Sequence, residues 1–137
     1  GKMILGKFVE NDLVEIEDIA AKGVPRVIAE NMVIGVDHAE IGARVLQHWA
    51  FPPEVVNAVR WHHDPDAVEV SDVQIDVIYL ANLLCQTNDM GCEENGSTLE
   101  LSPAVIDRLG IEMQEFESIS DTIADWVNEL SESLTFS

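Results

Sequence analysis

Residues 37–63 read DHAEIGARVLQHWAFPPEVVNAVRWHH, and this stretch decides the fold class. Before the tetrapeptide AFPP at residues 50–53, apolar side chains recur every three or four positions, as they do on one face of a helix. Asp37 and Glu40 have the spacing of a capping box, with an aspartate in the capping position. Pro53 suits the first turn of a second helix. The stretch therefore predicts two helices joined by a short turn, and such helices are expected to pack against each other.

The rest of the chain continues the helical pattern. Further helices are expected at residues 2–9, 12–22, 26–35, 72–90, 103–110 and 112–134. Residues 91–101 are expected to form a loop. Alternation of apolar and polar residues, which would indicate an amphipathic strand, does not extend over any useful length. The sequence therefore predicts an all-α protein, with residues 1–137 forming a single domain.

The charge of the chain is strongly acidic. Twenty-six acids and seven bases give a formal net charge of −19, and no basic patch is present. Phosphate backbones repel such a surface, so direct binding to nucleic acid is not expected. Neither an apolar run long enough for a membrane span nor a secretory signal occurs, which predicts a cytoplasmic protein. The acidic surface fits solubility or the docking of a basic protein partner.

The histidines are the residues best suited to chemistry. Three of the four fall on the apolar faces of the helices within residues 37–63, namely His38, His62 and His63. Imidazoles from neighbouring helices, with a carboxylate such as Asp64 nearby, suit a transition metal. The alternative is that these side chains are hydrogen-bonded within the core. Spacing alone favours that alternative, because adjacent histidines on a helix point about 100° apart and no compact ligand motif is present.

The apolar faces of the helices also identify the residues that are expected in the core. In the first pair of helices these core residues are Ile41, Trp49 and Val59. In the last helix the residues expected to face inward are Phe116, Ile119, Ile123, Trp126, Val127 and Leu130. The fourth histidine, His48, is expected at the surface. One face of the last helix is therefore predicted to be buried.

Residues 37–66 resemble the core segment of HDOD domains, the HD-related output domains of the HD superfamily of metal-dependent phosphohydrolases. The family pattern has a histidine, an isoleucine or valine with a glycine, a tryptophan before a proline, and a helix that ends in two histidines. The matching residues are His38, Ile41, Gly42, Trp49, Pro52, His62 and His63. The segment VIYLANLL at residues 77–84 fits a later helix of the same domain. The resemblance implies a compact helical bundle of the HD type.

The resemblance also implies the members of a metal site. In catalytic HD enzymes a His-Asp doublet supplies two ligands, and further histidines and a distant aspartate complete the site. His38 and one or both of His62 and His63 match the further histidines, while Asn82 stands where the distant aspartate is expected. An amide adds no negative charge, so it is a poorer ligand for a dication. The implied site is vestigial: it holds Fe, Mn, Ni or Zn weakly, or no metal.

Two motifs of the superfamily are missing from their expected places. Gly1 and Lys2 match the end of the Ile-Gly-Lys that follows the His-Asp doublet, so we expect the chain to be the later part of an HDOD domain, cut just after that motif. A Gly1 foreign to the natural sequence is the alternative. The Gly-Tyr-Pro motif of the cyclic-di-GMP phosphodiesterases does not follow His63, and the single tyrosine is Tyr79. That activity is therefore not expected.

Three functions remain. The resemblance implies a bacterial signal-transduction module, of the kind that serves as the output of response regulators and acts on a protein partner, with self-association left open. Asn82 and the missing motifs favour such a module without hydrolase activity. A metal-dependent phosphohydrolase acting on phosphodiesters or phosphomonoesters, with the three histidines and Asp64 in its site, is the alternative. A purely structural or dimerisation fragment is the third.

Overall fold

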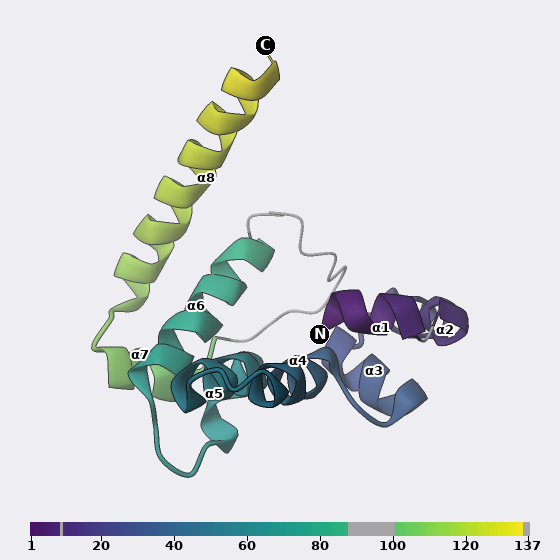
Figure 1. Cartoon of the computed structure of the whole chain (residues 1–137). Helices are drawn as coiled ribbons and strands as arrows, with labels where there is room; N and C mark the ends of the chain where they lie inside the picture. The colour runs from purple at the N-terminus through teal and green to yellow at the C-terminus, as the bar shows by residue number, and fades with distance from the viewer. Residues whose placement is uncertain (9, 88–100, 136–137) are drawn as a thin grey trace.

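The computed structural model describes residues 1–8, 10–87 and 101–135, and these ranges hold α-helices, one short 3₁₀ helix and no strand (Figure 1). The elements are α1 (Lys2–Phe8), α2 (Glu10–Ala20), α3 (Arg26–Ile34), α4 (His38–His48), α5 (Pro53–Trp61), η1 (Pro65–Ala67), α6 (Val73–Thr87), α7 (Pro103–Leu109) and α8 (Met113–Thr135). The predicted all-α class is confirmed. Within the described part of the chain, no helix combines the length and the hydropathy needed to cross a membrane.

The helix bounds follow the sequence pattern closely. The longest apolar helix, predicted at 72–90, is described as far as Thr87, and its last predicted residues lie outside the described ranges. The loop predicted at 91–101 also lies outside them, apart from Leu101. Local apolar periodicity and capping residues were therefore sufficient to place the helices along the chain.

Helix α4 begins at the predicted cap. The Asp37 carboxylate accepts a hydrogen bond from the backbone N–H of Glu40 at 2.9 Å. The reciprocal half of the capping box does not form. Instead, the Glu40 carboxylate accepts from Arg44 at 2.6 Å and from Arg60 of α5 at 2.9 Å. Glu40 therefore links α4 to α5 through Arg60, and its backbone N–H also takes part in the cap at the start of α4.

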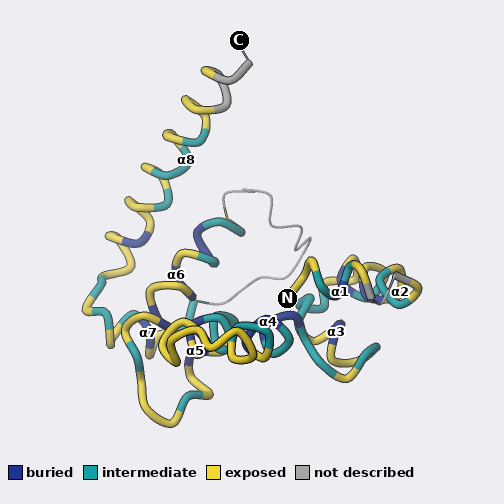
Figure 2. The backbone as a smooth tube through the Cα atoms, in the orientation of Figure 1, coloured by how far each residue is buried: buried dark blue, intermediate teal, exposed yellow. Residues whose placement is uncertain are grey.

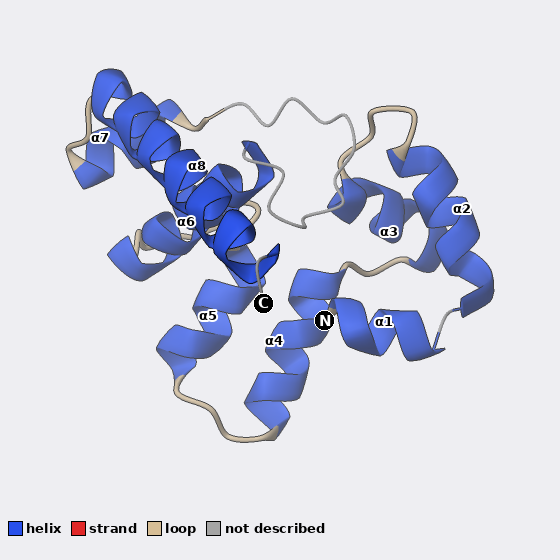
Figure 3. Ribbon diagram, turned by 90° about the horizontal axis from the view of Figure 1, so that it is seen from above, coloured by secondary structure: helices blue, strands red, loops and turns tan. Residues whose placement is uncertain are grey.

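Helices α4 and α5 pack side by side through small residues (Figure 3). Ala39, Ala43 and Ala58 are buried in this region. Figure 2 shows that buried residues gather in the lower part of the molecule, whereas most of α8 is exposed or intermediate. A Cβ added at Gly42 would lie 3.0 Å from Cγ1 of Val59 and 3.3 Å from the backbone nitrogen of Gly1. The glycine therefore permits a close approach that a larger residue would prevent.

A second cluster joins α6, α7 and the first half of α8. Its buried residues are Tyr79, Leu80, Leu83, Leu84, Val105 and Phe116, with Ile123 partly buried against them. Arg108 fixes the same region, donating to both oxygens of the buried Asp76 at 2.8 and 2.7 Å and to Asp66 at 3.0 Å. Beyond these contacts α8 runs away from the other elements (Figure 1).

The structure corrects two groups of core predictions. Trp49 is 65% exposed, because it caps the end of α4, where the chain turns outward. In α8, Ile119, Trp126 and Leu130 are 41%, 62% and 62% exposed, because no described element covers the outer part of this helix. Ile41 and Val59 are half-buried, and His48 is exposed as expected.

Candidate metal centre

The three histidines come together where the start of α4 meets the end of α5. His38 is the first residue of α4, His62 caps α5, and His63 follows it. Because a short turn makes the two helices neighbours, these ends lie side by side. The ring centroids are 5.6 Å apart for His38 and His62, 4.9 Å for His38 and His63, and 3.9 Å for His62 and His63. One potential ligand atom of each ring lies within 4.8 Å of the other two.

His38 is oriented by a carboxylate that the sequence pattern did not predict, that of Glu30. Oε2 of Glu30 lies 2.7 Å from Nδ1 of His38 and accepts the backbone N–H of the same residue at 2.8 Å. Oε1 accepts from Arg26 at 3.2 Å. Since a carboxylate only accepts, Nδ1 carries the proton and Nε2 of a neutral His38 is left with its lone pair. A carboxylate behind a histidine is the arrangement that fixes metal-binding imidazoles in the correct tautomer.

Glu30 is ionised in this setting. Its side chain is 1% exposed, and burial alone would raise its pKa. The hydrogen bonds from the side chain and backbone of His38, together with the charges of His38 and the Arg26 bond, outweigh burial and leave the pKa of Glu30 below its usual value. A sequence signal did exist, since Glu30 is a lone acid among the apolar residues of α3 and stands eight positions before His38.

The nearest approach in the cluster joins two ring nitrogens. Nε2 of His38 and Nε2 of His63 are 2.9 Å apart. Without an ion, His63 donates its Nε2 proton to His38. With an ion, both atoms would present lone pairs, and bonds of about 2.1 Å place neighbouring ligands about 3.0 Å apart in an octahedron and about 3.4 Å apart in a tetrahedron. The observed separation therefore fits two adjacent ligands of one ion.

His62 and His63 each meet a requirement of a metal ligand, the first in its tautomer and the second in its charge state. Nδ1 of His62 lies 2.6 Å from the carbonyl oxygen of Val59 and donates to it, which leaves Nε2 as the nitrogen suited to a metal. Burial, reinforced by the positive charges of His62, His38 and Lys2, lowers the pKa of His63 to about 3. His63 is therefore neutral at physiological pH, the state that metal binding requires.

The other predicted ligands are placed differently. Asp64 is exposed, and its carboxylate is not a member of the three-histidine group. Asn82 is half-buried on α6, and its role as a ligand stays a prediction. The donor set in the described residues consists of three imidazoles, which suits Fe, Ni or Zn better than Ca or Mg.

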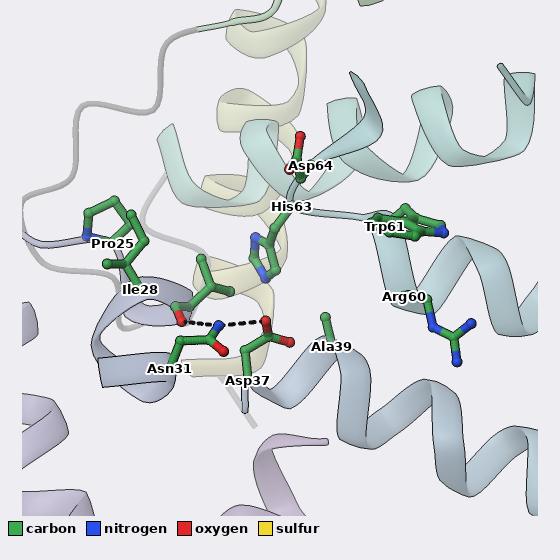
Figure 4. Close-up of a pocket in the computed structure, with 10 residues that line it drawn as sticks. Pro25, Ile28, Asn31, Asp37, Ala39, Arg60, Trp61, His63 and Asp64 are labelled. Carbon is green, nitrogen blue, oxygen red and sulfur yellow. Dashed lines mark hydrogen bonds between the residues drawn. The ribbon is translucent and has the colours of Figure 1, made fainter. Parts of the chain in front are cut away.

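A cavity of about 400 Å³ opens beside His63, between α3 and the facing ends of α4 and α5 (Figure 4). Its apolar wall includes Ile28, Ala39 and Trp61. Its polar wall includes Asn31, which donates to Asp37 at 2.8 Å. Figure 4 shows the His63 ring directed toward Asn31 and Asp37. A small ligand could therefore approach the histidines from this side.

Comparisons with known proteins find a similar family, a similar sequence and a similar fold. Residues 1–65 match the HDOD domain family. An uncharacterised protein from Treponema pallidum (strain Nichols) is 31% identical over 85 residues, which are 61% of this chain but only 17% of that protein. The crystal structure of a candidate signal transduction protein from Marinobacter aquaeolei VT8 superposes with a TM-score of 0.62 at 20% identity, over 75% of this chain and 22% of that one, and shows the shared fold. Residues 1–65, which match the HDOD domain family, make up just under half of the chain and contain all three clustered histidines.

Proposed function

We propose that the chain is a signal-transduction module of the HDOD type that acts through a protein partner and does not hydrolyse phosphoesters. The family match supports this role, since HDOD domains are HD-related output domains. The similar solved structure bears a signal-transduction name, which points in the same direction. We also propose that residues 1–137 act as one unit and that the protein is located in the cytoplasm.

The observation that carries the proposal is the composition of the histidine cluster. Its ligand group in the described residues contains no carboxylate. The buried carboxylate nearest to it, Glu30, already accepts hydrogen bonds from His38 and Arg26 through its two oxygens. A pair of ions in a phosphohydrolase site must be held a few ångströms apart, and three neutral imidazoles do not supply ligands for two dications. The cluster therefore supports one ion with a structural or sensing role.

The residues fit a single transition metal. His38, His62 and His63 would hold it, and Glu30 would keep His38 in the tautomer that leaves Nε2 available. When bound, such an ion would supply Lewis-acid chemistry and an activated water. Among Fe, Mn, Ni and Zn, the all-nitrogen set favours Fe, Ni and Zn over Mn.

A metal-dependent phosphohydrolase is the second candidate, and one observation favours it. The cavity beside His63 leaves room for a ligand next to the cluster. Sites with three histidines and one open position do activate water in some enzymes. The two functions therefore differ in whether a metal-loaded protein turns over a phosphoester.

The test is hydrolysis by the metal-loaded chain. The protein is loaded in turn with Fe, Mn, Ni and Zn and assayed with bis(p-nitrophenyl) phosphate and p-nitrophenyl phosphate. We expect no turnover above that of His38→Ala with His62→Ala. His48→Ala serves as the matched control, since His48 is exposed and outside the cluster. Hydrolysis that survives in the control and disappears in the double variant would overturn the proposal.

A further inference from the structure

The cavity beside His63 has a polar wall that accepts hydrogen bonds. Both amide hydrogens of Asn31 are already used, one in a bond to the carbonyl oxygen of Val27 at 2.9 Å and one in the bond to Asp37 at 2.8 Å. The capacity that remains on the side chains of Asn31 and Asp37 is therefore that of acceptor oxygens. Figure 4 shows these two side chains opposite the His63 ring.

His63 adds a ring nitrogen to these acceptors. Glu30 keeps the proton of His38 on Nδ1, so His63 donates from its own Nε2 to Nε2 of His38, 2.9 Å away. A neutral imidazole with its proton on Nε2 has a lone pair on Nδ1. In the described part of the chain, Nδ1 of His63 has no hydrogen-bond partner. Figure 4 shows a nitrogen of this ring on the side of Pro25 and Ile28, which line the cavity.

The donors among the lining residues point elsewhere. Arg60 donates through Nε to Glu40 at 2.9 Å, and Figure 4 shows its guanidinium turned away from His63. In the same view the indole nitrogen of Trp61 lies at the far end of its ring from His63. Asp64 also borders the cavity and adds a second acid to the lining. The described lining therefore favours a ligand that brings positive charge and N–H donors.

We propose that the cavity binds a small organic cation, an amidinium or a protonated amine carried on a flat apolar body. The charged N–H groups would bond to the acceptors of Asn31, Asp37 and His63, and the apolar body would lie against Ile28 and Trp61. The volume of about 400 Å³ suits a small molecule. An anionic ligand would instead meet acceptors that repel it.

The tautomer of His63 couples the cavity to the histidine cluster. To hold an ion through Nε2, His63 must keep a lone pair there, so its proton moves to Nδ1 and the cavity gains a donor in place of an acceptor. The positive charge of the ion also repels a cation nearby. Linkage is reciprocal, so an organic cation in the cavity weakens metal binding by the same factor. Only this coupling rests on the proposed function, in which the cluster has a sensing role.

The test compares three flat probes of nearly equal size in calorimetric titrations of the metal-free 137-residue chain. Benzamidinium is positively charged and carries N–H donors, benzamide is neutral, and benzoate is negatively charged. We expect benzamidinium to bind at least about tenfold more tightly than benzamide, the gain typical of a hydrogen bond to a charged group, and benzoate not to bind. Equal binding of the first two probes, or no binding of benzamidinium, would overturn the proposal.

Two substitutions on α3 locate the binding. Ile28 lines the cavity, whereas Met32, one turn later on the same helix, is not among the lining residues; they are 50% and 66% exposed. Ile28→Trp should fill the space and weaken benzamidinium binding about tenfold or more, whereas Met32→Trp should change it less than about twofold. Circular dichroism of both variants checks that the helices remain. Equal effects would place the binding outside the cavity and contradict the assignment.

Two aspartates that begin helices separate the local carboxylate from the net charge. The Asp37 side chain caps α4, and that of Asp72 accepts the backbone N–H of Gln74 at the start of α6 at 2.9 Å. Asp37→Asn and Asp72→Asn each remove one negative charge and keep a residue suited to a helix start. We expect benzamidinium binding to weaken about tenfold in the first and less than about twofold in the second. Equal losses would show attraction by the net charge of −19 alone and rule out a defined site.

Zinc tests the coupling through His63. Long-range proton–nitrogen correlation NMR identifies which ring nitrogen carries the proton. We expect the proton on Nε2 in the metal-free chain and on Nδ1 in the zinc-loaded chain, with benzamidinium affinity about tenfold or more lower in the latter. A chain that takes up zinc and keeps its affinity for benzamidinium would contradict the proposal.

An arginine side chain of a partner protein has similar chemistry to the free cation. N-acetylarginine methylamide represents it, and we expect this probe to bind more weakly than benzamidinium, because it lacks the flat apolar body. Tighter binding would assign the cavity to a partner's side chain and overturn the proposal. If the metal-loaded chain hydrolyses phosphoesters while the metal-free chain binds benzamidinium, the cation site stands although the proposed function fails. If the chain neither hydrolyses phosphoesters nor binds benzamidinium, only the cation site fails.

Discussion

Two regions of the molecule, the contact between α4 and α5 and the outer part of α8, have similar amphipathic sequence patterns. Their environments differ, because the first is packed and the second is exposed. In the first, small side chains bring the helices together, and the polar groups of the histidine cluster are hydrogen-bonded to one another. In the second, an equally amphipathic helix leaves its tryptophan exposed, and the helix itself contains no lysine or arginine among its carboxylates. An amphipathic pattern therefore predicts that a helix has a face to bury, but it does not identify what buries it.

The largest expected effect comes from Glu30→Ala. The change removes the acceptor of two hydrogen bonds from His38 and leaves Arg26 without its buried partner. We expect the free energy of unfolding to fall by about 3 kcal/mol, within the range for breaking a buried charged network. Urea denaturation measures it, with Glu17→Ala at an exposed position as the control. A fall no larger than that of the control would mean that Glu30 does not support the cluster.

The same network predicts a loss of stability in acid. Burial and the neighbouring positive charges lower the pKa of His63 to about 3, whereas an unfolded histidine titrates near 6.5. The unfolded state therefore binds more protons as the pH falls below 6.5, and folding stability decreases from there toward pH 3. The lowered pKa of Glu30 adds to the loss at the acidic end.

Denaturation of the metal-free chain between pH 8 and pH 4 measures this dependence. His63→Gln should flatten the part of the curve between pH 6.5 and pH 5, because the substitute does not titrate. His48→Gln is the matched control, since His48 is exposed and lies outside the cluster. A stability that is constant from pH 7 to pH 5 in the unaltered chain would contradict a buried neutral His63.

Two helical glycines test the close packing of α4. A Cβ at Gly42 would meet Val59 at 3.0 Å, whereas a Cβ at Gly6 in α1 meets nothing within 4 Å. We expect Gly42→Ala to destabilise the chain by about 1 kcal/mol, because overpacking outweighs the better helix propensity of alanine. Gly6→Ala should instead stabilise by up to about 1 kcal/mol. Thermal unfolding of both variants checks the opposite signs; the same sign in both would refute the packing argument.

The smallest expected effects come from the exposed tryptophans. Because Trp49 and Trp126 are already largely in solvent, replacing either with alanine should change the free energy of unfolding by less than about 0.5 kcal/mol. Chemical denaturation at low protein concentration measures both. A loss well above 1 kcal/mol for Trp126→Ala would show that the face of α8 is covered in solution, which would remove the contrast between the two regions.

What the sequence predicted and what it missed have different physical origins. Helix positions, the Asp37 cap and the convergence of His38 with His62 and His63 follow from local spacing and a short turn, which constrain only neighbouring segments. Glu30 was missed because its partner lies across the turn between α3 and α4, where spacing does not fix the geometry.

Two other residues show the limits of periodicity. Trp49 continues the apolar face of α4 in sequence, but the helix ends there and the side chain turns outward. Trp126 lies on a well-formed apolar face that no described element covers. In both cases the spacing of apolar residues correctly predicts the helix. Burial depends on tertiary neighbours, which this spacing does not encode.

The central claim, that the three imidazoles form one metal centre, is tested most directly by X-ray absorption of the chain loaded with Ni or Zn. The account predicts one ion per chain, with imidazole scattering from three histidines and nitrogen ligands at about 2.0–2.1 Å. His38→Ala should remove both the ion and that signature. An ion retained in this variant, or a bound ion with no imidazole among its ligands, would contradict the account.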